Sequence, residues 1–178
     1  TMVTFHPDPE IFEETVFDFH TLKHRFREIA FLTKGLKIIA KDNRGEEPKE
    51  TVFHYEGGIR EFVQYLNKST TALYEEILYF EGTKDGVMVE VAMQHNDSYT
   101  ENTYGFVNNI TTPEGGTHVV GFRNALTKTF NEYARKNKLL KDSDANLSGE
   151  DIREGLTAII SVKIEDPQFE GQTKQKLG

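Results

Sequence analysis

Apolar residues recur three or four positions apart in three parts of the chain, and this is the spacing of one helix face. These parts span residues 19–30, 59–66 and 117–133. Gly35 follows the first part, and a glycine pair precedes the third. The third helix is expected to be the longest, with the hydroxyl of Thr117 capping its first turn.

Alternation of apolar and polar positions predicts strands elsewhere. Residues 87–93 alternate most clearly, and a turn signal at Asp85-Gly86 joins them to a strand near residues 77–80. A third strand near residues 104–109 is expected to complete a meander. Residues 36–40 and 53–55 predict a hairpin around a polar loop, and residues 2–5 predict a short strand at the start.

Two features near the C-terminus complete this pattern. Ser148 and Asp151 stand at capping-box spacing, which predicts a short helix that ends at Gly155. Residues 156–164 are apolar on both alternating faces, which is typical of a central strand covered on both sides. From Asp166 onward the chain is polar.

Helices and strands are mixed without strict alternation, which predicts an α+β fold with one sheet and helices largely on one face. The length of 178 residues fits a single domain over residues 1–178. Residues 166–178 are expected to form a polar tail of that domain.

The charge and composition narrow the class of protein. The net charge of −8 argues against a dedicated nucleic-acid binder, whose affinity depends on basic residues, although it leaves room for a local basic patch. The chain has no cysteine, so disulfides and thiolate metal sites are excluded. It has neither a secretory signal nor an apolar run long enough to cross a bilayer, and we expect a cytoplasmic protein without membrane contact.

Familiar chemical motifs are incomplete in this sequence. Asp142, Asp144 and Asn146 imitate the start of an EF-hand loop, but Leu147 and Arg153 occupy the positions that need glycine and glutamate. The histidines form no pair with a metal-binding context, and no glycine-rich phosphate loop is present. The residues alone therefore predict an acidic α+β domain with a polar tail and assign it no metal.

Several longer runs carry a more specific signal. In chain order they are YEGGIR (55–60), YLNK (65–68), NDSY (96–99), FVNNI (106–110), EGGTH (114–118), GFR (121–123), LSGEDIREGL (147–156), ISVK (160–163), PQF (167–169), GQTK (171–174) and KLG (176–178). Together they resemble the transducer domain, the second domain of the ATPase region in the B subunits of bacterial DNA gyrases, which are type IIA topoisomerases. The resemblance covers essentially the whole chain.

The resemblance implies a ribosomal-protein-like two-layer α/β sandwich with a left-handed βαβ crossover, an exception to the usual handedness. It also implies a larger enzyme that couples ATP hydrolysis to closure of a dimer gate and to DNA strand passage. ATP and Mg²⁺ would be bound mainly by a preceding domain, so the isolated chain is expected to hold neither and to be inactive. The implied partners are the gyrase A subunit, a second B subunit and double-stranded DNA, with the fragment itself a monomer or weakly associating.

Three residues receive roles from this resemblance. Gln172 and Lys174 of the QTK motif are expected to contact the γ-phosphate of ATP, and Lys174 is the catalytic candidate because its ammonium can stabilise charge on the transferring group. Arg123 of the GFR motif is expected to face DNA, and a surface salt bridge is the alternative for this side chain.

The motifs and the composition are also compatible with two other functions. The equivalent domain of the topoisomerase IV B subunit shares the same motifs. A stand-alone nucleic-acid-binding module of the same fold is the second alternative, which the net charge of −8 disfavours.

Overall fold

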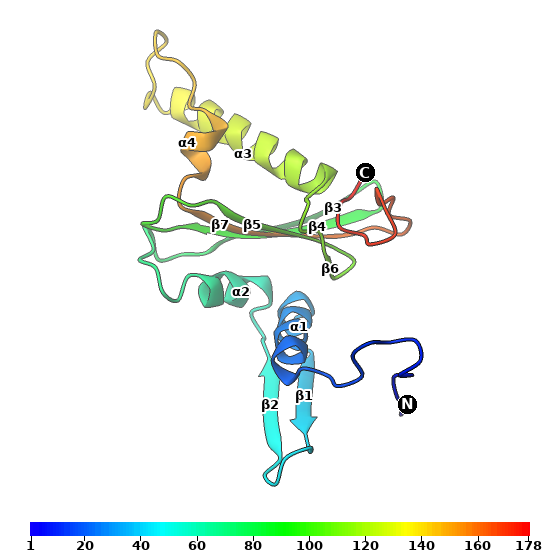
Figure 1. Cartoon of the computed structure of the whole chain (residues 1–178). Coiled ribbons are helices and arrows are strands. Elements are labelled where there is room, and N and C mark those ends of the chain that lie inside the picture. The colour runs from blue at the N-terminus through cyan, green and yellow to red at the C-terminus, as the bar shows by residue number, and fades with distance from the viewer. The chain divides into compact units, whose positions relative to one another are not determined.

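The computed structural model describes residues 1–178 and divides them into two compact units, Thr1–Glu56 and Gly57–Gly178. The prediction of one domain over residues 1–178 remains a prediction, since it concerns how these units act together. The elements, drawn in Figure 1, are α1 (Phe19–Leu32), β1 (Lys37–Asp42), β2 (Lys49–His54), α2 (Ile59–Leu66), β3 (Leu78–Lys84), β4 (Val87–His95), β5 (Asn102–Val107), β6 (Ile110–Thr111), α3 (Thr117–Lys136), α4 (Gly149–Arg153) and β7 (Leu156–Lys163).

The first unit consists of α1 and the β1–β2 hairpin. The side chain of Asp18 caps the helix by accepting a 2.7 Å hydrogen bond from the backbone N–H of Thr21. The hairpin is antiparallel, and Ala30 of α1 packs with Ala40 and Phe53 of the two strands in a small core. The predicted helix and hairpin are both confirmed.

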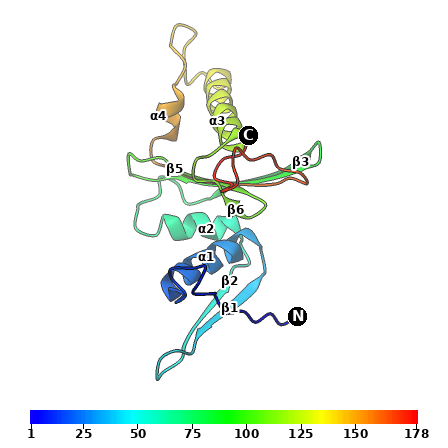
Figure 2. The same cartoon turned by 45° about the vertical axis from the view of Figure 1, so that its right-hand side comes forward.

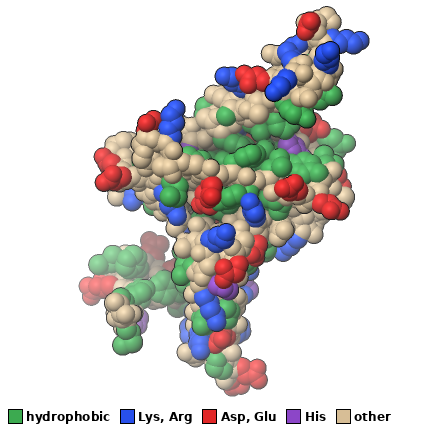
Figure 3. All heavy atoms as spheres, turned by 180° about the vertical axis from the view of Figure 1, so that it is seen from behind, with side chains coloured by type: hydrophobic (Ala, Val, Ile, Leu, Met, Phe, Trp, Pro, Cys, Tyr) green, Lys and Arg blue, Asp and Glu red, His purple; other side chains and the backbone are tan.

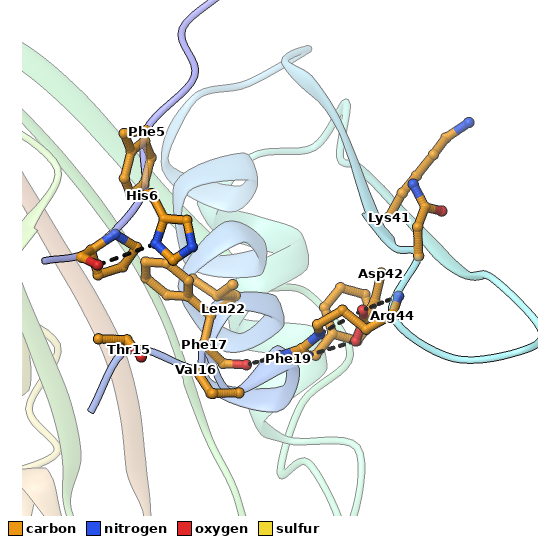
Figure 4. A pocket seen from close by; sticks show the side chains of 12 residues that line it. Phe5, His6, Thr15, Val16, Phe17, Phe19, Leu22, Lys41, Asp42 and Arg44 are labelled. Atoms are coloured by element: carbon orange, nitrogen blue, oxygen red, sulfur yellow. Dashed lines mark hydrogen bonds and ion pairs between the residues drawn. The ribbon is translucent and has the colours of Figure 1, made fainter. Parts of the chain in front are cut away.

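The segment before α1 differs from the prediction. Residues 2–5 form no strand, and Met2 and Phe5 are exposed, because no neighbouring strand offers them backbone partners. The segment is instead fastened to the hairpin by Arg44, whose Nη1 donates to the carbonyl of Phe17 at 2.7 Å (Figure 4). Hydrogen bonds from the same arginine hold the pKa of the Asp42 carboxyl at about 2.

The second unit is built on a five-stranded sheet in the order β3-β4-β7-β5-β6. Its central strand β7 is buried from Leu156 to Val162, as its apolar sequence predicted. The β3–β4 hairpin with its turn at Asp85-Gly86 is also confirmed. The predicted meander is wrong, because β5 does not pair with β4. The more apolar β7 lies between them, antiparallel to β4 and parallel to β5, and takes the position with the most burial.

Helices cover both faces of this sheet, which corrects the expectation of helices largely on one face and of two layers. Leu156, Ala158 and Ile160 of β7 pack in one core with Leu126 of α3. The alternate residue Thr157 points to the other face, where α2 lies. Figures 1 and 2 show α3 and α4 on one side of the sheet and α2 on the other. The mixed α+β class itself is confirmed.

A buried polar network fixes the end of α2 to the sheet. Asn67 donates to Gln94 at 3.0 Å, and its side-chain oxygen accepts from Asn96 at 3.0 Å and from Thr157 at 2.7 Å. All four side chains are buried. Because each buried polar group has a partner, the network specifies the position of α2 rather than destabilising the core.

The starts of α3 and α4 give opposite outcomes. The capping box of Ser148 and Asp151 is present as predicted. Thr117 does not cap α3, since it is the first helical residue and Gly116 occupies the cap position without a side-chain bond. The Thr117 hydroxyl donates instead to the carbonyl of Gly178 at 3.0 Å. The cap prediction failed because the C-terminal residues approach this end of the helix.

Candidate functional site

The polar tail forms an ordered loop that we call the C-terminal loop, residues 168–178. Its base is closed by Gly178, which donates to the carbonyl of Gln168 at 2.8 Å, and by a bridge between Phe169 and Leu177. Leu177 is buried in the main core, whereas the tip remains outside. The base of the loop is therefore held in place by these contacts, while its tip is exposed to solvent.

The QTK motif occupies this tip. The backbone N–H of Lys174 donates to the carbonyl of Gly171 at 3.1 Å and closes the turn, and Lys174 has a φ of 57°, unusual for a residue with a side chain. Gln172 and Lys174 are both exposed. The ammonium of Lys174 lies 6.0 Å from the centre of the Phe169 ring and has no carboxylate partner. Lys176, in contrast, is bound to Glu170 at 3.0 Å.

An unpaired ammonium and an exposed amide on a tight turn fit a phosphate ligand. The Lys174 ammonium is a compact charge with donors and no acceptor. The Gln172 amide can donate from the same turn. The resemblance implies a contact from these residues to the γ-phosphate of ATP, and that role remains a prediction.

The base of the C-terminal loop is bonded to the start of α3. The N–H of Leu177 donates to the carbonyl of Gly115 at 3.1 Å, and its carbonyl accepts from the N–H of Thr117 at 3.2 Å. Gly116 lies between these bonds with a φ of 135°, and a Cβ there would stand 2.6 Å from the Leu177 nitrogen. Only glycine fits, so the loop and the helix meet backbone to backbone (Figures 1 and 2).

Arg123 lies in the second turn of this helix, about 9 Å from its start at 1.5 Å per residue. Its Nε and Nη2 both lie 2.8 Å from Oε1 of Glu101. Its side chain remains 41% exposed, so part of the guanidinium still faces solvent. The salt-bridge alternative is therefore present in the structure, and the DNA-facing role remains a prediction.

Glu101 was not among the residues that the sequence singled out. Its other oxygen accepts from Nε of Arg153 at 3.0 Å, and Thr103 donates to Oε1 at 2.8 Å. Burial alone would raise the pKa of Glu101, but the hydrogen bonds from Thr103, Arg123 and Arg153 hold that pKa below its ordinary value. Only the fold joins residues 101, 123 and 153, and no local sequence signal could have found this cluster.

His118 and Gly105 form a tight contact beside the start of α3. Nε2 of His118 lies 3.0 Å from the hydroxyl of Thr112, and a Cβ on Gly105 would lie 2.5 Å from the same nitrogen. Nδ1 of His118 is buried without a partner. Burial lowers the pKa of His118 below its ordinary value, so the neutral ring is the form that the fold accommodates.

A pH dependence of stability follows from this burial. The unfolded chain takes up a proton near the ordinary histidine pKa of about 6.5, whereas folded His118 resists protonation until lower pH. The contribution of His118 to the free energy of unfolding is therefore fully present above that pH. It is lost as the pH drops below it toward the lower pKa of the folded state. Urea unfolding at pH 7.5 and 5.5 should show this loss, and His118→Gln should reduce it. An equal loss in the variant would assign the effect to other groups.

An apolar groove lies between α3 and the face of the sheet that α3 covers. Figure 3 shows hydrophobic side chains gathered there. Its lining comes from β4, α3, β7 and the C-terminal loop, and includes Val87, Val89, Val91, Phe122, Ala125, Ile160, Val162 and Leu177.

No group of three or more His, Cys, Asp or Glu side chains is placed to hold a metal ion. No helix is both long and apolar enough to span a membrane.

Comparison with known proteins assigns the chain to a family. A family model described as DNA gyrase B matches residues 58–178. The B subunit of a DNA gyrase from Bacillus cereus is 58% identical over 179 residues, covering 100% of this chain and 44% of the relative. The B subunit of a DNA topoisomerase 4 from Enterococcus faecalis is 56% identical over 180 residues, covering 100% of this chain and 26% of the relative.

A solved structure gives the same result. The 43K ATPase domain of Thermus thermophilus gyrase B, in complex with an aminocoumarin, is 39% identical and superposes with a TM-score of 0.83 over 96% of this chain and 45% of that one. The sheet and its helices thus have the fold of part of the ATPase region of a type IIA DNA topoisomerase. The chain belongs to the DNA gyrase B family and carries its transducer domain. It spans less than half the length of these relatives.

Proposed function

We propose that this chain is the energy-coupling part of an ATP-dependent type IIA DNA topoisomerase, within the B subunit of DNA gyrase. The proposal rests on the backbone hydrogen bonds that join Leu177 of the C-terminal loop to Gly115 and Thr117 at the start of α3. A contact to the γ-phosphate made by Lys174 would bear directly on the helix that carries Arg123. Such a contact exists with ATP and not with ADP, so the two nucleotides favour different arrangements.

In place of the single domain over residues 1–178 that the sequence predicted, we propose that the transducer domain comprises residues 57–178 and that residues 1–56 form a separate unit. The family model begins at residue 58, and the compact units divide between Glu56 and Gly57. Within the second unit, the parallel strands β5 and β7 are joined through α3 and α4. We propose that this connection is the left-handed crossover expected for the family.

The remaining parts of the enzyme complete the proposed activity. ATP and Mg²⁺ would be held mainly by residues outside this chain, with Gln172 and Lys174 supplying contacts to the γ-phosphate. The partners would be the gyrase A subunit, a second B subunit and double-stranded DNA in the cytoplasm. Arg123 would face that DNA with the exposed part of its guanidinium.

The equivalent role in topoisomerase IV is the second candidate. Its specific support is the topoisomerase 4 relative from Enterococcus faecalis, which is 56% identical to this chain, against 58% for the gyrase relative from Bacillus cereus. Negative supercoiling by the reconstituted enzyme would distinguish gyrase, whereas relaxation and decatenation without supercoiling would indicate topoisomerase IV.

The proposal is tested by comparing this chain with a longer protein. The chain alone should hydrolyse no ATP, while the intact B subunit that contains it should hydrolyse ATP at a rate that rises with DNA when its partner is present. Hydrolysis by the chain alone, or hydrolysis by the intact protein that ignores DNA, would contradict the proposed function.

A further inference from the structure

One carboxylate, that of Glu101, binds two arginines from different helices. Arg123 belongs to α3, Arg153 closes α4, and Glu101 itself immediately precedes β5. We propose that Glu101 is a positioning residue that transmits a phosphate contact on Arg123 to the sheet and to α4. This inference rests on the proposed DNA-facing role of Arg123 and adds a residue to it.

Glu101 fixes the orientation of the Arg123 side chain and leaves part of its guanidinium free to bind a second anion. Nε and Nη2 lie on one oxygen of Glu101, which sets the plane of the guanidinium. A guanidinium has five N–H donors, so donors remain for a second anion. The 41% exposure of the Arg123 side chain leaves room for that anion, whereas Arg153, at 17%, is mostly covered.

The charge of the cluster favours an anion as the additional ligand. Two guanidiniums share one carboxylate, which leaves one positive charge uncompensated in a chain whose net charge is −8. A phosphate oxygen accepts charge-assisted hydrogen bonds from arginine in the same way as a carboxylate does. The backbone of double-stranded DNA supplies such phosphates in a row.

The links from Glu101 run to three elements. Its Oε1 holds Arg123 on α3 and accepts from Thr103 on β5, and its Oε2 holds Arg153 on α4. A displacement of Arg123 on binding DNA phosphate would therefore move Glu101 and, through it, β5 and α4. Without it, Arg123 could still bind phosphate but would be attached only to its own helix.

The test is DNA-dependent ATP hydrolysis by the intact B subunit with its partner. Glu101→Gln should lower the maximal stimulation by DNA by about fivefold or more, the lower range of measured couplings between sites. The half-saturating DNA concentration should stay the same or decrease, because the variant removes a negative charge near the phosphates. Glu132→Gln, also on the α3 surface and 3.8 Å from Lys128, is the matched control and should keep full stimulation.

The double variant separates positioning from general damage. In an Arg123→Ala background, Glu101→Gln should lower the maximal stimulation no further. The same loss in both backgrounds, or a weaker half-saturation together with a lower thermal midpoint, would overturn the inference. If Glu101→Gln does not fold, Thr103→Val removes the 2.8 Å bond to the same oxygen and should lower the maximal stimulation by about twofold. Full stimulation in that variant would overturn it as well.

Failure of the inference can be distinguished from failure of the proposed function. If Arg123→Ala loses stimulation while Glu101→Gln keeps it, only the positioning role is wrong. If Arg123→Ala itself keeps full stimulation, the DNA-facing role of Arg123 is wrong, and the inference falls with it.

Discussion

Replacing Lys174 by alanine in the intact protein is expected to slow ATP hydrolysis by about 100-fold, the order of effect seen when one donor to a developing charge is removed. Lys174 lies at an exposed turn, and its ammonium has no carboxylate partner. Steady-state hydrolysis would show the lower turnover number. Equilibrium binding of a non-hydrolysable ATP analogue should weaken much less, because other residues would hold the base and sugar.

The matched control is Lys176→Ala, two residues away in the same loop. Lys176 is paired with Glu170 at 3.0 Å on a partly exposed surface, and such pairs contribute little. This variant should keep its turnover within about twofold of the unchanged protein. Wild-type turnover in Lys174→Ala, or an equal loss in Lys176→Ala, would show that the loop does not act through the Lys174 ammonium.

Replacing Gly116 by alanine is expected to destabilise the second unit by about 3 kcal/mol or more. The φ of 135° disfavours any side chain, and the new Cβ would meet the backbone nitrogen of Leu177 at 2.6 Å and its carbonyl oxygen still closer. The backbone cannot yield without breaking the bonds to Gly115 and Thr117. Chemical unfolding measures the change in free energy.

Gly121→Ala gives the control on the same helix. Apart from its chain neighbours and the backbone of its own helix, no atom lies within 4 Å of the Cβ that alanine would add there, and the backbone is helical. Alanine should therefore stabilise the helix by about 0.5–1 kcal/mol. Equal stability changes for the two variants would mean that the contact between Gly116 and Leu177 is not tight.

Much of the local structure could be predicted from the sequence because it depends on neighbours in the chain. Apolar spacing indicated α1, α2 and α3, and the capping box at Ser148 and Asp151 indicated α4. The run of apolar residues in β7 also predicted its central place, since a strand apolar on both faces must be covered on both.

What failed depends on contacts between distant residues. The sequence could not show that β7 would separate β4 from β5, or that α2 would cover the second face. Thr117 has a side chain typical of a helix cap. Leu177 and Gly178 lie against that end of the helix, however, and the Thr117 hydroxyl donates to Gly178 instead. Residues 2–5 alternate like a strand but have no strand beside them.

The candidate site divides in the same way. Gln172, Lys174 and Arg123 were identified by resemblance of their motifs to a family, and their neighbours were not. The pairing of Arg123 with Glu101 spans 22 positions, and that of Arg153 with Glu101 spans 52. Such pairings can be predicted only once the fold is known, because they join the residue before β5 to α3 and α4.

In the proposed coupling, a γ-phosphate contact at Lys174 changes α3 through the backbone of Leu177. Amide hydrogen exchange at residues 115–120 of the intact B subunit tests it most directly, with a non-hydrolysable ATP analogue compared with ADP. Exchange there should be slower with the analogue in the unchanged protein, and Lys174→Ala should abolish the difference. Equal exchange with both nucleotides, or a difference that persists in Lys174→Ala, would contradict the account.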